Sequence, residues 1–126
     1  MRELTIVTEN RVGALADVCE ALGHVGVNVS SISAHGYANK GIIRLVTSDE
    51  ITAKKTLEKI GMNVVLGDLL IVKIPDRPGE IGKLTRKLSD FNINIEGIYL
   101  LGRSNSRLEM AIKPDDIQKA SQAIKR

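Results

Sequence analysis

Residues 9–15 read Glu9-Asn10-Arg11-Val12-Gly13-Ala14-Leu15, and 66 positions later residues 75–81 read Pro75-Asp76-Arg77-Pro78-Gly79-Glu80-Ile81. At this offset the match runs without a gap from residues 4–60 onto residues 70–126. Apolar residues keep their spacing between the matched stretches, so both halves are predicted to build the same supersecondary unit.

The positions that are identical in the two copies include Gly13 and Gly79, Asn28 and Asn94, Gly36 and Gly102, and Asp49 and Asp115. The repeat predicts two domains, residues 1–67 and residues 68–126. Units of this size bury only about 60% of the surface of the unfolded chain, so each gains stability by association.

Alternating apolar residues predict strands, and apolar residues three or four apart predict helices. In the first copy they predict a strand at 4–8, a helix at 13–24, strands at 27–34 and 42–47 around a turn at 35–41, a helix at 49–60 and a strand at 63–66. This βαββαβ order predicts an α+β fold of the ferredoxin-like type, an antiparallel sheet with two helices on one face.

The second copy repeats the pattern but stops before its fourth strand. Its predicted elements are a strand at 70–74, a helix at 79–91, strands at 93–101 and 108–113, and a final helix beginning near Asp115. Asp49 and Asp115 are expected to cap the second helix of their copies. The strand at 70–74 then lies at a sheet edge, which invites pairing with another strand. Two candidates remain open: the segment 63–66 folding back as a hairpin, and a strand from another subunit.

The composition excludes several classes of protein. The chain has 126 residues, 43% hydrophobic and 26% charged, and no apolar run of eighteen residues that could span a bilayer. Its net charge of +3 is scattered, and Tyr37, Tyr99 and Phe91 are its only aromatic residues, which argues against nucleic-acid binding. A strand pattern begins directly at the N-terminus, so we expect a cytoplasmic protein.

Catalytic and metal sites are not predicted. His24 and His35 have no second ligand at zinc spacing, and the single Cys19 has no activating neighbour. No Ser, Cys or Lys stands in a nucleophile motif. We therefore expect neither an enzyme nor a cofactor.

Two kinds of residue nevertheless suit a small ligand. Gly13 and Gly79 stand where a helix begins, and without a side chain they let backbone amides approach a carboxylate or phosphate. The amides of Asn10 and Asn28 both donate and accept, so together they can hold the ammonium and carboxylate of a zwitterion. The same residues also suit helix capping and tight turns, and this structural explanation stays open.

The quoted stretches, followed by Gly26-Val27-Asn28-Val29 and by Ile93-Asn94-Ile95, resemble the two signature stretches of the ACT domain. ACT domains are βαββαβ modules that bind amino acids and regulate enzymes of amino-acid metabolism. The resemblance covers nearly the whole chain twice and is greatest to phosphoglycerate dehydrogenase regulatory domains and acetolactate synthase small subunits. It implies a ligand site at an interface between two modules, formed by Asn10, Arg11, Val12, Gly13, Ala14, Leu15 and Asn28 in the first copy and by Asp76, Pro78, Gly79 and Asn94 in the second.

Two residues depart from the family pattern. Val12 replaces the usual proline and loosens the turn. Asp76 replaces the asparagine and places a negative charge where a ligand carboxylate would lie, so the second copy favours an ammonium group or no ligand.

The sequence leads to one hypothesis with two rivals. We expect a stand-alone tandem ACT regulatory protein, a homodimer that binds a small amino acid or related metabolite between modules and acts on an enzyme of amino-acid metabolism. One alternative is the regulatory small subunit of a biosynthetic enzyme such as acetolactate synthase. The other is a purely structural oligomerisation module without a ligand.

Overall fold

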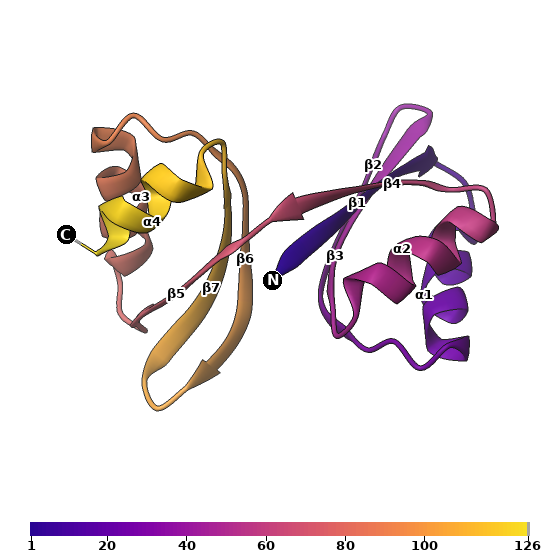
Figure 1. Ribbon diagram of the computed structural model, residues 1–126, viewed down its shortest axis with the longest axis horizontal. Coiled ribbons are helices and arrows are strands. Elements are labelled where there is room, and N and C mark those ends of the chain that lie inside the picture. Colours follow the sequence, from indigo (N-terminus) through magenta and orange to yellow (C-terminus); the bar gives the residue numbers. More distant parts are fainter. Residues whose placement is uncertain (126) are drawn as a thin grey trace. The chain divides into compact units, whose positions relative to one another are not determined.

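The computed structural model describes residues 1–125 and divides the chain into two compact units. One unit comprises residues 2–67, and the other comprises the chain from Asp68 onward together with Met1. Each has its own hydrophobic core. Figure 1 follows the order of the elements along the chain.

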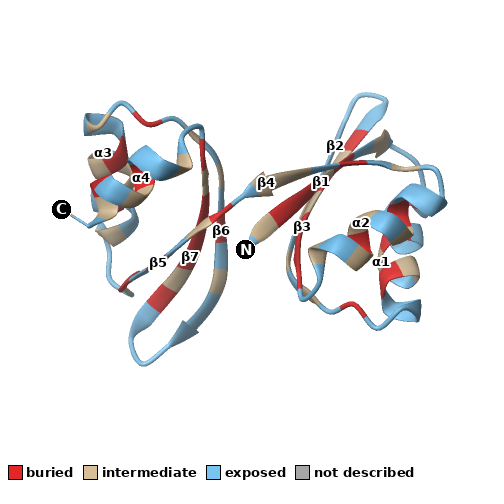
Figure 2. Ribbon diagram, viewed as in Figure 1, coloured by how far each residue is buried: buried red, intermediate tan, exposed pale blue. Residues whose placement is uncertain are grey.

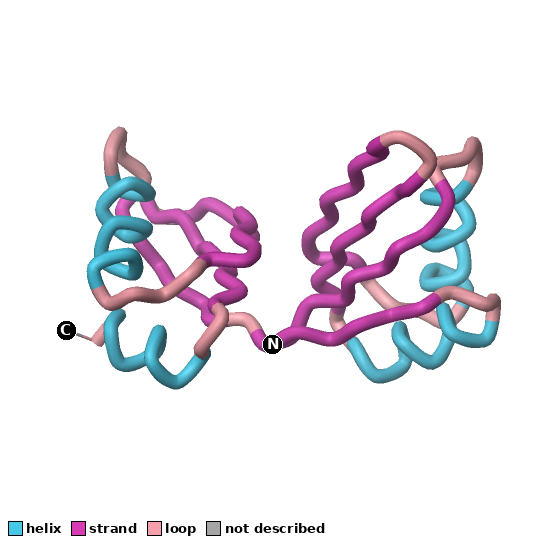
Figure 3. Tube along the Cα trace, turned by 90° about the horizontal axis from the view of Figure 1, so that it is seen from above, coloured by secondary structure: helices cyan, strands magenta, loops and turns pink. Residues whose placement is uncertain are grey.

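The first unit has the predicted βαββαβ order. Its elements are β1 (Arg2–Glu9), α1 (Ala14–His24), β2 (Val29–Tyr37), β3 (Lys40–Thr47), α2 (Glu50–Lys59) and β4 (Asn63–Asp68). The strands form one sheet in the order β2-β3-β1-β4, in which β3 is antiparallel to both β1 and β2. Both helices cover the same face of this sheet (Figure 3).

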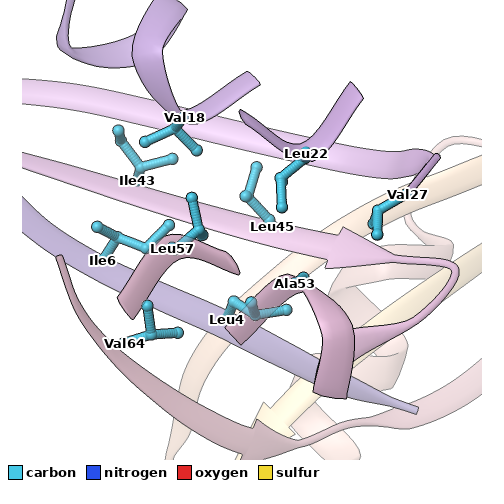
Figure 4. Close-up of a cluster of buried hydrophobic side chains, with 10 residues drawn as sticks. All are labelled: Leu4, Ile6, Val18, Leu22, Val27, Ile43, Leu45, Ala53, Leu57 and Val64. Atoms are coloured by element: carbon cyan, nitrogen blue, oxygen red, sulfur yellow. The ribbon is translucent and has the colours of Figure 1, made fainter. Parts of the chain in front are cut away.

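Residue spacing explains how this core forms. Ala14, Val18 and Leu22 of α1 are buried, and they recur every fourth residue, which places them on one helix face. On β1 the buried Leu4 and Ile6 alternate with the more exposed Thr5 and Val7, as they do in a strand with one covered face. Figure 2 shows the buried residues on the facing sides of helices and sheet, and Figure 4 shows the side chains that meet there.

The α2 helix has the predicted ends. Asp49 caps it by accepting a hydrogen bond from the backbone N–H of Thr52 at 3.1 Å, and Gly61 follows the helix with φ of 88°. Strand β4 then places Val64 in the core beside Ile6 and Leu57 (Figure 4). None of the helices in the described part of the chain is long and apolar enough to cross a membrane.

The second unit contains β5 (Leu70–Pro75), α3 (Glu80–Asp90), β6 (Ile95–Ser104), β7 (Arg107–Pro114) and α4 (Ile117–Ile124). Its sheet has three strands in the order β5-β7-β6, so β5 lies at an edge. A fourth strand is absent from the described residues 1–125, as the sequence predicts. Strand β4 pairs with β1 in the first sheet, so the segment 63–66 does not form a hairpin over β5.

The gapless offset of 66 is wrong beyond residue 100. Leu101 is an extra residue in β6, because the pairing with β7 shifts between Leu100 and Gly102. From this bulge onward the equivalent residues are 67 apart, as the hairpin pairs Tyr37 with Lys40 and Ser104 with Arg107 show.

The bulge also moves the predicted helix cap. Helix α4 is capped by Asp116, whose side chain accepts from the Lys119 N–H, and not by Asp115. Asp115 instead takes the place of Ser48 in the first unit. Its Oδ1 accepts a hydrogen bond from the Asn94 N–H at 3.1 Å.

The turn predicted at 35–41 is tighter than expected. Strand β2 continues to Tyr37 and β3 begins at Lys40, so Ala38 and Asn39 alone connect them. Ala38 adopts a positive φ of 52°, which two-residue hairpins require. The longer strands bring the end of β2 close to the beginning of α1.

Candidate functional site

The candidate site lies at the turn between β1 and α1. Gly13 is the N-cap of α1 with φ of 88° and ψ of −6°, in the left-handed region that favours glycine. Gly79 repeats this conformation before α3, with φ of 88°. The sequence repeat therefore encodes the same strand-to-helix turn in both units.

Asn10 is fixed against the β2–β3 hairpin by two hydrogen bonds. Its backbone N–H donates to the Asn39 carbonyl oxygen and its side-chain Nδ2 donates to the Ala38 carbonyl oxygen, both at 3.0 Å. An amide nitrogen that donates in this way orients the group and leaves Oδ1 to accept a hydrogen bond.

Gly36 makes this position of Asn10 sterically possible. A Cβ atom at Gly36 would lie 2.7 Å from both Nδ2 and Oδ1 of Asn10, closer than non-bonded atoms approach. The glycine is needed here for close contact and not for an unusual φ. The position of the Asn10 side chain therefore requires a residue without a side chain at position 36.

Next to this pair the surface forms a hollow of about 140 Å³. A cavity of roughly 150 Å³ is large enough for benzene, so the volume suits a ligand of about six heavy atoms. Its lining comes from the β1–α1 turn and the ends of β2 and β3, and consists of Thr8, Glu9, Asn10, Arg11, Ala14, Leu15, Ala34, His35, Gly36, Gly41 and Ile43.

The charges around the hollow are partly paired. Arg11 Nη2 lies 2.7 Å from Asp17 Oδ2, and Nη1 donates to the Val12 carbonyl oxygen at 3.3 Å. Glu9 also lines the hollow. Ala14 and Leu15 belong to the first turn of α1, where backbone N–H groups and the helix dipole favour an anion. The hollow thus offers acceptors for an ammonium group and donors for a carboxylate.

The predicted residues of the first copy separate into three groups. Asn10, Arg11, Ala14 and Leu15 line the hollow. Gly13 shapes the turn, and Val12 is fully exposed. Asn28 lies elsewhere, just before β2 begins.

Asn28 and the hollow lie at opposite ends of β2. The strand separates Asn28 from Gly36 by eight residues, which is roughly 25 Å in an extended chain. The Asn28 N–H donates to Ser48 Oγ at 3.0 Å, and the residue is exposed. One small ligand cannot contact Asn10 and Asn28 of the same unit.

The second unit has a different arrangement at the equivalent place. Arg103 Nη1 lies 2.8 Å from Asp76 Oδ2, and the Asp76 N–H donates to the Ser106 carbonyl oxygen. Because of the bulge at Leu101, Arg103 takes the register position of Gly36. An ion pair therefore stands where the first unit has asparagine against glycine. Pro78 and Gly79 are exposed beside it.

Asn94 corresponds to Asn28 and borders a separate hollow. This hollow is lined by Ser89, Asn92, Ile93, Asn94 and Asp115. The hollow lies at the end of β6 away from the hairpin, so Asp76 and Asn94 are also not brought together within one unit.

Sequence reasoning missed several of these residues. Glu9, His35 and Gly36 line the hollow, and Arg103 neutralises Asp76. The spacing of Gly36 and Gly41 around a short turn is a signal that could have indicated a close approach to a neighbouring segment. Among residues 1–125, no group of three His, Cys, Asp or Glu side chains is placed to hold a metal ion.

The chain thus consists of two consecutive ferredoxin-like units, the first of which has a small polar hollow at its first strand-to-helix turn. The family model of the ACT domain pair matches residues 1–125. The chain belongs to this family.

Solved structures agree with this fold. A crystal structure of a Bacteroides thetaiotaomicron protein is 29% identical, covers 98% of this chain and 85% of its own, and has a TM-score of 0.88. The ligand-free regulatory subunit of aspartate kinase from Thermus thermophilus is 20% identical over 98% of this chain and 90% of its own, with a TM-score of 0.73. No curated protein matches the chain significantly.

Proposed function

We propose that this protein is a stand-alone regulatory protein that binds a small amino acid or a related metabolite between two modules. The observation that carries the proposal is the hollow in which Asn10, fixed by Gly36 and Ala38, lies beside the first turn of α1. Asn10 Oδ1 and Glu9 would accept from the ligand ammonium, and the amides of α1 would donate to its carboxylate.

The hollow is half of the proposed site. Its volume is below the 300–1,000 Å³ that is typical of ligand pockets, so a second surface is needed to enclose a ligand. Strand β2 forms an edge of its sheet, and the neighbouring Leu15 and Ile32 are 40% and 46% exposed. Exposed apolar residues beside an open strand edge favour association.

Two first units from different chains can meet along β2 with a two-fold axis. The two copies of β2 are then antiparallel, so the end of one lies beside the start of the other. This arrangement brings Asn28 of one chain to the Asn10 hollow of its partner, which removes the separation of roughly 25 Å within one unit. A homodimer would contain two identical sites.

The ligand would regulate by stabilising the associated state. The ligand binds across the interface, so it binds the associated chains more tightly than the separated ones. This difference in affinity sets how far the ligand shifts the equilibrium toward association. We propose that an enzyme of amino-acid metabolism in the cytoplasm responds to this change, and that the protein itself catalyses no reaction. The likeness to regulatory subunits of aspartate kinase supports the fold of such a regulator.

Titration calorimetry against the twenty amino acids tests the proposal. We expect heat from one or a few small amino acids, and a loss of affinity of about tenfold or more in Asn10→Ala, because a hydrogen bond to a charged group is removed. Asn63→Ala serves as a control, since Asn63 is an exposed asparagine outside the hollow. Absence of heat from every amino acid on the wild type would favour a purely structural module.

A further inference from the structure

The hollow at the candidate site exists because one row of the first sheet lacks large side chains. Thr8, Gly41 and Gly36 lie side by side in this row, on three neighbouring strands. Thr8 and Gly41 each lie two residues from a buried core residue, Ile6 and Ile43, so the row faces the helices. Two of its three positions have no side chain, which leaves space beside the start of α1.

The second unit fills the same row. Its equivalent residues are Ile74, Leu108 and Arg103, which pair in the same order. Ile74 and Leu108 are 8% and 5% exposed and belong to the second hydrophobic core. In the next row Leu100 takes the place of Ala34. Each of these four positions therefore carries a larger side chain in the second unit than in the first.

The base of the hollow is apolar. The buried residues that line it are Ala14, Gly41 and Ile43, and none of them has a polar side chain. A Cβ atom at Gly41 would lie 3.4 Å from Cγ2 of Thr8, so the methyl group of this threonine points toward Gly41. Small residues at positions that could hold large ones cost stability, because core contacts are lost. An apolar group of a ligand would restore such contacts.

The volume limits the size of this group. A hollow of about 140 Å³ holds about six heavy atoms. The nitrogen, the Cα and the carboxylate carbon of an amino acid account for about half of them, and the carboxylate oxygens would lie at the rim, against the amides of α1. The remaining space suits a side chain of about three carbons.

We propose that the ligand of this site is an amino acid with an aliphatic side chain of the size found in valine, and that this side chain lies against Gly41 and Ile43. It takes the place that the side chain of Leu108 fills in the second unit. The inference rests on the proposed function, because Asn10 and the first turn of α1 hold the ammonium and carboxylate groups.

Calorimetry with a graded series of ligands tests the inference. Glycine, alanine, 2-aminobutyrate and valine have the same ammonium and carboxylate groups and differ in the number of aliphatic carbons. Affinity for the full chain should rise about fourfold with each added carbon, because each buries one more methyl or methylene group. Serine, which has a hydroxyl in place of the terminal methyl of 2-aminobutyrate, should bind about tenfold more weakly than 2-aminobutyrate.

Gly41→Ala tests the place of the side chain. The new methyl group would meet no atom closer than 3.4 Å, so the fold accommodates it and part of the hollow is filled. Affinity for valine should fall about tenfold, because the ligand side chain is now too large, while affinity for glycine should stay within about twofold. An unchanged urea midpoint of unfolding, or a higher one, shows that the variant is folded.

Gly102→Ala is the matched control, since it adds a methyl group to a strand of the second unit with no atom within 4 Å. It should leave the affinities for glycine and valine unchanged. Absence of heat from every amino acid would overturn both the proposed function and this inference. Valine binding no tighter than glycine, serine binding as tightly as 2-aminobutyrate, or equal losses for glycine and valine in Gly41→Ala would overturn the inference alone.

Discussion

Asn10 and Gly36 are in close contact at the candidate site, and a single methyl group would disturb this contact. In Gly36→Ala the new Cβ would meet the end of the Asn10 side chain at 2.7 Å. That side chain is flexible and exposed, so we expect it to move away from Ala38 while the fold stays intact. Affinity for the amino acid should fall about tenfold or more, measured by titration calorimetry.

Gly102→Ala is the matched control for this change. Gly102 is also an exposed glycine of a strand near a hairpin, and a Cβ there would meet no atom within 4 Å. Ligand affinity should therefore remain that of the wild type. Equal losses in the two variants would contradict a specific role for the Asn10–Gly36 contact.

Replacing either of two glycines at the start of α3 by alanine should change the stability of the protein, in opposite directions at the two positions. Gly79 has φ of 88°, so Gly79→Ala forces a side chain into the left-handed region and should destabilise the protein by about 1 kcal/mol. Gly82 lies within the helix with no atom near its Cβ position, so Gly82→Ala should stabilise it by about 0.5–1 kcal/mol. Urea unfolding measures both, and stabilisation by Gly79→Ala would refute the assigned turn geometry.

At the scale of the elements, the bulge in β6 makes the two copies differ at the candidate site. It brings Arg103 to the position of Gly36, where Arg103 pairs with Asp76. The variant Asp76→Asn with Arg103→Gly recreates the asparagine and glycine of the first unit. We expect calorimetry to show additional ligand bound per chain. An unchanged stoichiometry would mean that further residues of the second unit prevent binding.

Helix α2 should show a dependence of stability on pH through its cap. The side-chain hydroxyl and the backbone N–H of Thr52 donate to Asp49, which lowers the pKa of the carboxyl below its usual 3.8. A lowered pKa in the folded state gives a stabilisation that is complete above the pKa of the unfolded chain. This stabilisation is lost as the pH falls through the folded value.

The comparison of wild type with Asp49→Asn isolates this contribution. The difference in unfolding free energy should be constant from pH 7 to about 5 and should shrink below about 4, where the carboxyl of the wild type becomes protonated. Urea unfolding at each pH gives the difference. A difference that grows as the pH falls would contradict the assigned cap.

At the scale of the whole molecule, the sequence was sufficient to predict the repeated architecture. Apolar residues alternate in the strands and recur every three or four residues in the helices, and the two patterns follow one another in both halves. Asp49 and Gly61 mark the beginning and the end of α2. The bulge at Leu101 was not predictable, because one extra residue inside an apolar strand leaves the pattern of residue types nearly unchanged. The cap was consequently assigned to Asp115 and not to Asp116.

The candidate site was predictable where it depends on local sequence. Asn10, Ala14 and Leu15 lie within one strand-to-helix turn, so their proximity follows from chain connectivity. His35 and Gly36 join them only through the pairing of β2 with β3, whose register depends on the length of the hairpin. The distance between Asn28 and Asn10 depends on the length of β2. The types of the residues alone do not determine that length.

Mixing two weakened variants tests the central claim most directly. Asn10→Ala and Asn28→Ala each remove one side of every proposed site, so each variant alone should bind the amino acid about tenfold or more weakly than the wild type does. Subunit exchange in an equal mixture should restore about one quarter of the wild-type sites, because half the dimers are mixed and each regains one intact site. Calorimetry that finds no restored binding in a mixture proven to exchange subunits would contradict a ligand site shared between chains.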